Sequence, residues 1–279
     1  MRLSIEHLSR YRYRSSVKSS YNEARMTPIN TGGQLVLSSS ISTLPHSSIF
    51  EYVDYFGTIV SAFDIHEPHN ELEVKATSLV ETTSRTKDMT DASWSYLRSD
   101  EVTLSLCEYL GSSYYINNGD LIEELACELQ STKEPAEFVR SVVTYIQDNL
   151  DYKPGSTSVT TPAIDALLGR AGVCQDFAHL MISLCRSAGV PARYVSGYLY
   201  PVRDVSVGEK SCGESHAWVE VFLGRWYSID PTNNLAIGSH HVVLGRGRDY
   251  SDVRPLHGIY QGGDLDSLDV EVSFTLMSL

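Results

Sequence analysis

The first third of the chain alternates apolar and polar residues in short runs, which is the pattern of half-buried β-strands. Turn-forming residues separate these runs, at Gly32-Gly33, Pro45, Gly57 and Pro68. Short strands at regular spacing with turn residues between them are typical of a small β-sandwich. We therefore expect an N-terminal β-domain over residues 1–85, with strands at 2–8, 10–14, 35–42, 49–55, 58–65 and 71–80.

After a polar stretch over residues 83–98, the apolar period lengthens to about 3.6 residues, which predicts amphipathic helices. Pro135 suits the first turn of one of them, where either Glu134 alone or a capping box of Ser131 with Glu134 would begin the helix. Another helix runs from Cys174 and ends before Gly189, a favourable stop signal. The predicted helices are 104–110, 121–129, 136–150, 164–168 and 174–188.

The last third of the chain returns to strand patterns, most clearly where Leu268 to Leu276 alternates apolar and polar residues. The other predicted strands are 193–200, 217–222 and 226–229. Helices followed by strands indicate an α+β fold, with helices packed on an antiparallel sheet. We expect this second unit to span residues 86–279, to include the C-terminal strand, and to carry its chemistry within residues 150–235.

The composition is that of a globular protein, with 42% hydrophobic and 20% charged residues in 279. Lys and Arg number 22 against 35 Asp and Glu, a formal net charge of −13. A negative protein is a poor partner for nucleic acid or an anionic membrane surface, so we expect neither. No run approaches the ~18 apolar residues of a membrane span. Whether the chain forms a homo-oligomer is left open.

The cysteines point to a reducing environment. There are five, an odd number, and none forms a C-x-x-C pair, so a disulfide framework is not expected. Residues 1–14 lack the apolar segment of a signal peptide. We therefore expect a cytoplasmic protein with free thiols and without a cofactor.

Cys174 is the best-placed nucleophile in the sequence. It opens a predicted helix, where free backbone N–H groups and the helix dipole favour a thiolate over a thiol. A buried cysteine that only fills space is the alternative, and Cys185, inside the same helix beside Leu184, fits that description better.

A reactive thiolate needs a base, and the base needs an acceptor that orients it. His216 begins the predicted strand that follows the helix, and Asp230 ends the next strand. Their separation of 230 − 216 = 14 positions suits a hairpin that brings both side chains to one edge. Taken separately, His216 could be a loop histidine and Asp230 a turn initiator; together with Cys174 they supply a nucleophile, a base and an orienting carboxylate.

Four segments in order resemble the bacterial branch of the transglutaminase-like superfamily. They are Gly172 to His179, Gly189 to Tyr198, His216 to Glu220, and Asp230 to Asn233. Upstream, Asn22 to Met26 and Asp54 to Gly57 resemble the β-domain that often precedes this core, and Gly247 to Pro255 resembles the family's tail. The resemblance implies a papain-like core with Cys174 as nucleophile, His216 as general base and acid, and Asp230 as its orienting partner.

Several residues are candidates for supporting the triad. The backbone N–H of Cys174 is one candidate oxyanion donor. Well-known family members use a tryptophan upstream of the cysteine, but the upstream Trp94 is far away in sequence, so Tyr152 is the substitute we would test. Asp176 is expected to cap its helix or to pair with Arg193. Trp218 could shape a channel for an amine, although packing in the sheet core explains it at least as well.

Three other segments contain residues of the types that bind metal or phosphate, but their spacing does not fit such sites. Asp176 and His179 follow Cys174 too closely to match a standard zinc pattern. His240 and His241 are adjacent, so on a strand their side chains would point to opposite faces. The Gly245 to Arg248 segment lacks the glycine spacing and the lysine of a phosphate loop. We therefore expect no metal site.

These features predict a cysteine-dependent enzyme that acts on an amide. Our preferred interpretation is hydrolysis of a peptide, isopeptide or side-chain amide in a peptide or protein substrate, through a cysteine acyl-enzyme. The first alternative is a protein-glutamine transamidase that uses the same triad. The second alternative, from a different class, is a non-catalytic binding or scaffold protein with this fold.

Overall fold

The computed structural model describes residues 1–84, 89, 92–116, 119–201, 206–233 and 237–278. Its strands are β1 Arg2–Ala24, β2 Gln34–Leu44, β3 Phe50–Val53, β4 Ile59–Ile65, β5 His69–Thr82, β6 Asp151–Tyr152, β7 Ala171–Gly172, β8 Ala192–Leu199, β9 Lys210–Phe222, β10 Trp226–Ile229, β11 His241–Gly247, β12 Leu256–Gly262 and β13 Leu265–Ser278. Its helices are α1 Trp94–Leu97, α2 Asp100–Ser105, η1 Cys107–Tyr109, α3 Asp120–Gln130, α4 Pro135–Asn149, α5 Ala163–Gly169, α6 Cys174–Ser187 and η2 Tyr250–Asp252. The α+β class predicted from the sequence is confirmed.

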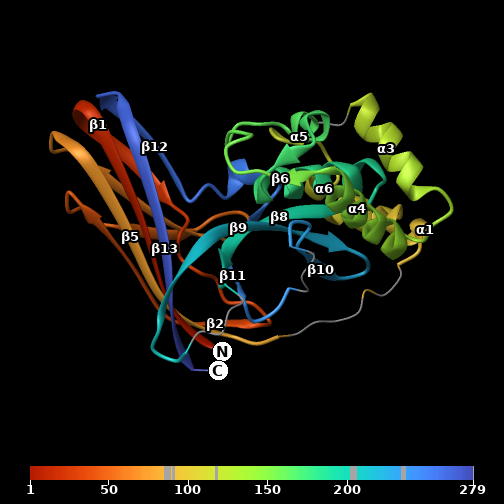
Figure 1. The fold of residues 1–279 in the computed structure, drawn as a ribbon, viewed down its shortest axis with the longest axis horizontal. Coiled ribbons are helices and arrows are strands. Elements are labelled where there is room, and N and C mark those ends of the chain that lie inside the picture. The colour runs from red at the N-terminus through yellow and green to blue at the C-terminus, as the bar shows by residue number, and fades with distance from the viewer. Residues whose placement is uncertain (85–88, 90–91, 117–118, 202–205, 234–236, 279) are drawn as a thin grey trace.

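A long curled antiparallel sheet connects the two ends of the chain (Figure 1). β1 is 23 residues long and pairs with β5 and β13 along its first half, then with β4 and β12 along its second. β13 also pairs with β9 through residues 272–275. The N-terminal strands and the C-terminal strands therefore form one continuous structure, and the two termini lie side by side.

The sequence-based division assigned the C-terminal strand to the second unit. In the structure, β13 pairs with β1 from Arg2 to Tyr13 but meets β9 over only four residues. Its buried residues Val272, Phe274 and Leu276 join a cluster with Leu3 and Ile5. β13 thus lies between β9 and β1 and joins the strands of the two units in one sheet, and its apolar face is buried there.

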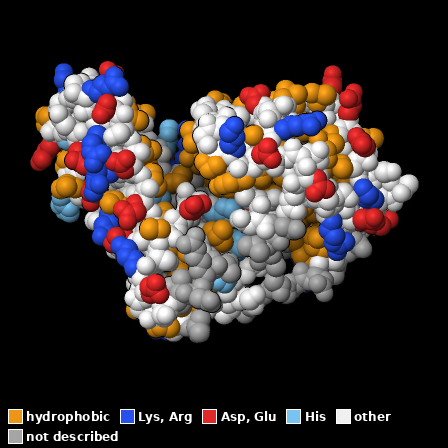
Figure 2. Space-filling view, viewed as in Figure 1, with side chains coloured by type: hydrophobic (Ala, Val, Ile, Leu, Met, Phe, Trp, Pro, Cys, Tyr) orange, Lys and Arg blue, Asp and Glu red, His pale blue; other side chains and the backbone are white. Residues whose placement is uncertain are grey.

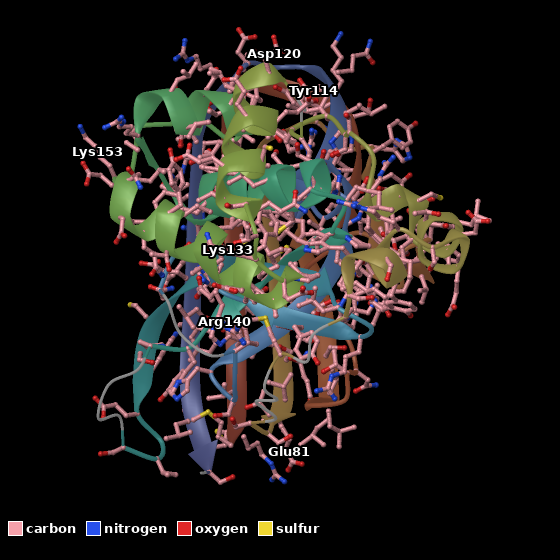
Figure 3. The ribbon with its side chains drawn as sticks, turned by 90° about the vertical axis from the view of Figure 1, so that its right-hand side faces the viewer. Glu81, Tyr114, Asp120, Lys133, Arg140 and Lys153 are labelled. Atoms are coloured by element: carbon pink, nitrogen blue, oxygen red, sulfur yellow. The ribbon has the colours of Figure 1, made fainter. Side chains whose placement is uncertain are left out.

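The helices form a layer over the second part of the sheet. Figure 3 shows this layer in front of the strands, with Asp120 of α3 at one end of the molecule and Glu81 of β5 at the other. α6 lies at the centre, with nearly all of its side chains buried, and packs against α3, α4, α5, β8 and β9. No helix in the described ranges is long and apolar enough to cross a membrane.

Several predicted boundaries changed. The predicted helix at 104–110 is instead the end of α2 followed by the short η1. α4 begins at Pro135, after Glu134 as its N-cap residue, and Glu134 makes no side-chain capping bond. β11 was not predicted because both of its faces are buried, which removes the polar–apolar alternation. β12 was not predicted because it is mostly exposed and rich in glycine.

Candidate active site

Cys174 is the first residue of α6, and its surroundings are built to hold the start of that helix. The carboxylate of Asp176 accepts hydrogen bonds from the backbone N–H of Val173 at 2.8 Å and from the hydroxyl of Thr157 at 2.6 Å. A side chain at Gly172 would meet the Asp176 carboxylate, its hypothetical Cβ lying 2.7 Å from the Cβ of Asp176. Gly172 is therefore required for the cap that fixes the position of the thiol.

This geometry decides between the two roles predicted for Asp176. It caps α6, as expected, and the predicted pairing with Arg193 is wrong. Arg193 instead donates to the carboxylate of Glu220 at 2.7 Å, across the β8–β9 ladder. Burial raises the pKa of Asp176. The hydrogen bonds from Thr157 and Val173 lower it, but they replace only part of the lost hydration.

His216 and Asp230 meet at the edge formed by β9 and β10, as the hairpin argument predicted. The two strands are antiparallel, with Ile229 opposite Val219, so the residue after β10 lies beside the middle of β9. The Nε2 atom of His216 lies 2.8 Å from Oδ2 of Asp230, and both side chains are buried. The bond to Asp230 occupies Nε2 and leaves Nδ1 as the ring nitrogen available to the thiol.

The electrostatics link all three residues. Burial alone would lower the pKa of His216, but hydrogen bonds to Asp230 and then to Cys174 outweigh it and raise the pKa to about 9. Burial would likewise raise the pKa of Asp230, yet the bonds from His216 and His241 hold it well below its usual range. His216 is therefore positively charged at neutral pH.

Asp230 is held by more partners than the triad itself supplies. Oδ1 accepts from the backbone N–H groups of Thr232 at 2.9 Å and Asn233 at 3.2 Å, and Oδ2 accepts from the amide of Asn233 at 3.0 Å. His241 adds a contact from its Nε2 to Oδ2 at 3.5 Å. The carboxylate is thus locked in place and cannot rotate away from His216 without losing several bonds.

His241 was missed as a neighbour of the site. The prediction placed His240 and His241 together on one strand, whereas β11 begins at His241 and brings that residue beside Asp230. The ligand atoms of His216, Asp230 and His241 lie within 4.8 Å of one another, close enough to hold a metal ion together. In the structure Oδ2 of Asp230 contacts both imidazoles, at 2.8 Å from Nε2 of His216 and 3.5 Å from Nε2 of His241, which is what an orienting network for His216 requires.

Trp218 lies behind His216 and not in an open channel. Its side chain is fully buried and stacks on the imidazole, with ring centroids 6.1 Å apart. It also presses against Gly197, where an added Cβ would lie 2.4 Å from the indole and 2.2 Å from the carbonyl oxygen of Val242. Within the described residues, Trp218 is therefore core packing that supports the imidazole.

Tyr152 lies on the strand next to the residues that lead into Cys174. β6 pairs with β7, which brings Tyr152 opposite Gly172, two residues before Cys174. The tyrosine is about half exposed, at 50%. Burial raises the pKa of its phenol, and the charge of Cys174 adds to this effect. The phenol is thus protonated, and its role as an oxyanion donor stays a prediction.

Together these residues can carry out acyl transfer. A cysteine at a helix N-terminus and an imidazolium held by a carboxylate are the parts of a cysteine-dependent acyl-transfer site. Free N–H groups in the first turn of α6 and the hydroxyl of Tyr152 can stabilise the charge of a tetrahedral intermediate.

Two family models match the chain in the expected order. Residues 3–81 match the bacterial transglutaminase-like N-terminal region, and residues 123–231 match the core of the transglutaminase-like superfamily. A crystal structure of a "Putative Cysteine Protease from Cytophaga hutchinsonii" shares the fold, with a TM-score of 0.75 and 24% identity over 98% of this chain and 90% of that one.

Relatives in sequence extend over the whole chain. An uncharacterized protein of Mycobacterium leprae is 40% identical over 277 residues, covering 99% of each chain, and one of Mycobacterium bovis is 33% identical over 97% of this chain and 91% of its own. A protein-glutamine gamma-glutamyltransferase of Pseudomonas aeruginosa is 30% identical over 110 residues, which are 35% of this chain and 16% of that protein. The chain belongs to the bacterial branch of the transglutaminase-like superfamily, whose members are generally cysteine-dependent enzymes.

Proposed function

We propose that this protein hydrolyses an amide bond in a peptide or protein substrate, through an acyl-enzyme on Cys174. The observation that carries the proposal is the buried pair of His216 and Asp230, in which Nε2 of His216 lies 2.8 Å from Oδ2 of Asp230 and Nδ1 is left for the Cys174 thiol. The same imidazole can take the thiol proton, deliver it to the leaving amine and then activate water.

The reaction balances in two steps. The Cys174 sulfur attacks the amide carbon, the C–N bond breaks, and the amine leaves with the proton held by His216. Water then attacks the thioester while His216 accepts its proton, which releases a carboxylate and returns the free thiol. Asp230 stays ionised throughout, because its hydrogen-bond donors hold its pKa low.

Transamidation is the second candidate, and it differs only in the molecule that resolves the acyl-enzyme. The partial similarity to a protein-glutamine gamma-glutamyltransferase supports it. Against it, Trp218, the residue expected to shape a channel for an amine, is fully buried in the core. This favours water as the acceptor.

A mixture of peptides from digested casein tests the proposal without a known substrate. The peptides are incubated with the protein in H₂¹⁸O, with and without ethylamine, and analysed by mass spectrometry. Hydrolysis predicts ¹⁸O in new carboxylates, and transamidation predicts ethylamide products. Neither product should form with Cys174→Ala. If that variant is as active as the wild type, Cys174 is not the nucleophile.

A further inference from the structure

A cleft of about 340 Å³ separates the N-terminal sheet from the helical core, and no step of the chemistry above uses it. Residues of β1, β12 and β13 form one wall, and Tyr115, Val159, Thr160 and Tyr250 form the other. Figure 2 shows the molecule hollowed between these two lobes. Five tyrosines line the cleft, so its walls are flat and largely apolar with polar tips: Tyr11, Tyr13, Tyr115, Tyr250 and Tyr260.

One side chain in this cleft lacks a partner. The Nε atom of Arg254 is buried and has no hydrogen-bond acceptor, and Nη2 makes only a long contact of 3.4 Å to the hydroxyl of Tyr115. Arg254 makes no ion pair with a described carboxylate, although the chain carries a net charge of −13. A buried charged donor without an acceptor is costly, which points to an acceptor supplied from outside.

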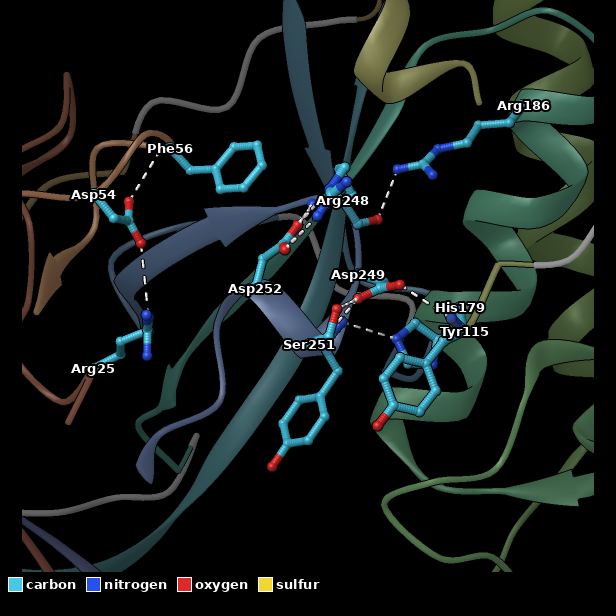
Figure 4. A network of polar contacts seen from close by, with 11 residues as sticks. Arg25, Asp54, Phe56, Tyr115, His179, Arg186, Arg248, Asp249, Ser251 and Asp252 are labelled. Atoms are coloured by element: carbon cyan, nitrogen blue, oxygen red, sulfur yellow. Dashed lines mark hydrogen bonds and ion pairs between the residues drawn. The ribbon is translucent and has the colours of Figure 1, made fainter. Parts of the chain in front are cut away.

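The wall beside Arg254 is rigid. Asp249 accepts from the backbone N–H of Tyr115 at 3.0 Å and from that of Ser251 at 2.8 Å, and His179 accepts from the backbone N–H of Tyr250 at 3.2 Å (Figure 4). The rings of Tyr115 and His179 are stacked, with centroids 4.8 Å apart. A ligand that enters this cleft meets side chains already in position, which lowers the entropy lost on binding.

The cleft also reaches the beginning of α6. The carbonyl oxygen of Val159, a lining residue, accepts a hydrogen bond of 3.1 Å from the side chain of Gln175, the residue after Cys174. On the opposite side, Tyr250 is a ring neighbour of Tyr194, with centroids 6.3 Å apart. Tyr194 also contacts the ring of His179 on α6, with centroids 5.1 Å apart, so it joins the cleft wall to that helix.

We propose that this cleft is a substrate subsite, in which Arg254 binds a carboxylate of the peptide substrate and the tyrosines pack against its apolar or aromatic part. Arg254 lines the cleft, and its guanidinium matches one carboxylate, which it can bind through its terminal N–H groups. Binding of a polyanion is disfavoured, because the net charge of the protein is strongly negative and a single arginine cannot offset the repulsion. The identification of the ligand as a substrate rests on the proposed function. The binding of a carboxylate in the cleft is independent of that function.

Binding can be measured apart from catalysis with a matched pair of small probes. N-acetylphenylalanine and N-acetylphenylalaninamide differ only in the carboxylate. Each is titrated into the full-length Cys174→Ala variant, and saturation-transfer NMR gives the two dissociation constants. We expect the acid to bind at least about fivefold more tightly than the amide, the discrimination that a hydrogen bond to a charged group provides.

Two further variants in the Cys174→Ala background assign that preference to the cleft. Arg254→Gln should bind the acid and the amide equally, whereas Arg140→Gln, which removes an exposed arginine outside the cleft, should keep the preference. Equal binding of the two probes to the Cys174→Ala protein would overturn the proposal, whether or not Arg254→Gln folds. So would a preference for the acid that survives in a folded Arg254→Gln. Either result, combined with rapid alkylation of Cys174 in the wild-type protein, would leave the proposed chemistry intact and reject only the subsite.

Discussion

The buried pair of His216 and Asp230 makes the stability of the protein depend on pH. The pKa of His216 is raised from 6.5 to about 9 in the folded state. A raised pKa contributes stability that is fully present below pH 6.5 and is lost as the pH rises through 9. At roughly 1.4 kcal/mol for each pH unit, this difference corresponds to about 3 kcal/mol, which the wild type should lose between pH 6 and pH 9.5 relative to His216→Gln.

Urea unfolding followed by tryptophan fluorescence at both pH values measures this loss. Asp230→Asn should remove most of the pH dependence that His216 causes, and Cys174→Ala should remove less, because the hydrogen bond to Asp230 raises the pKa of His216 more than the bond to Cys174 does. If the wild type and His216→Gln keep a constant difference in unfolding free energy from pH 6 to pH 9.5, the imidazolium–carboxylate pair described here does not exist.

Three other substitutions test the support of the site. Gly197→Ala would displace Trp218 from its place against the imidazole. It should lower the unfolding free energy measured in urea by about 3 kcal/mol and slow the alkylation of Cys174. Asp176→Ala removes the cap of α6 and should cost about 1–2 kcal/mol in the same assay; an unchanged midpoint would contradict the capping role. His241→Phe keeps a ring but removes one donor to the triad carboxylate, so thiol alkylation should slow at least severalfold, while the control His240→Phe should leave the alkylation rate at the wild-type value.

The parts of the site that depend on local sequence were predicted well. A cysteine at the start of a periodic apolar stripe is recognisable because helix periodicity and helix termini are local properties. The separation of His216 and Asp230 along the chain suited a hairpin, and strand direction then fixed which ends meet. The capping role of Asp176 followed from its place in the first turn of the same helix.

The missed parts depend on contacts between distant segments. His241 reaches Asp230 because β11 pairs with β8, and no local sequence pattern predicts that pairing. The partner of Arg193 was wrong because its acceptor, Glu220, lies on the neighbouring strand and not on the helix. The pairing of β13 with β1 joins residues more than 250 positions apart, which alternation alone cannot assign.

The stabilised thiolate on Cys174 is the central claim, and the rate of alkylation by iodoacetamide at pH 6 tests it most directly. Mass spectrometry locates the label, and the exposed Cys107, Cys127 and Cys212 serve as internal controls in the same molecule. An ordinary free thiol is under about 1% ionised at this pH. We predict that Cys174 reacts at least about tenfold faster than the three exposed cysteines, and that His216→Gln removes this advantage. Alkylation of Cys174 no faster than that of the exposed cysteines would contradict the account.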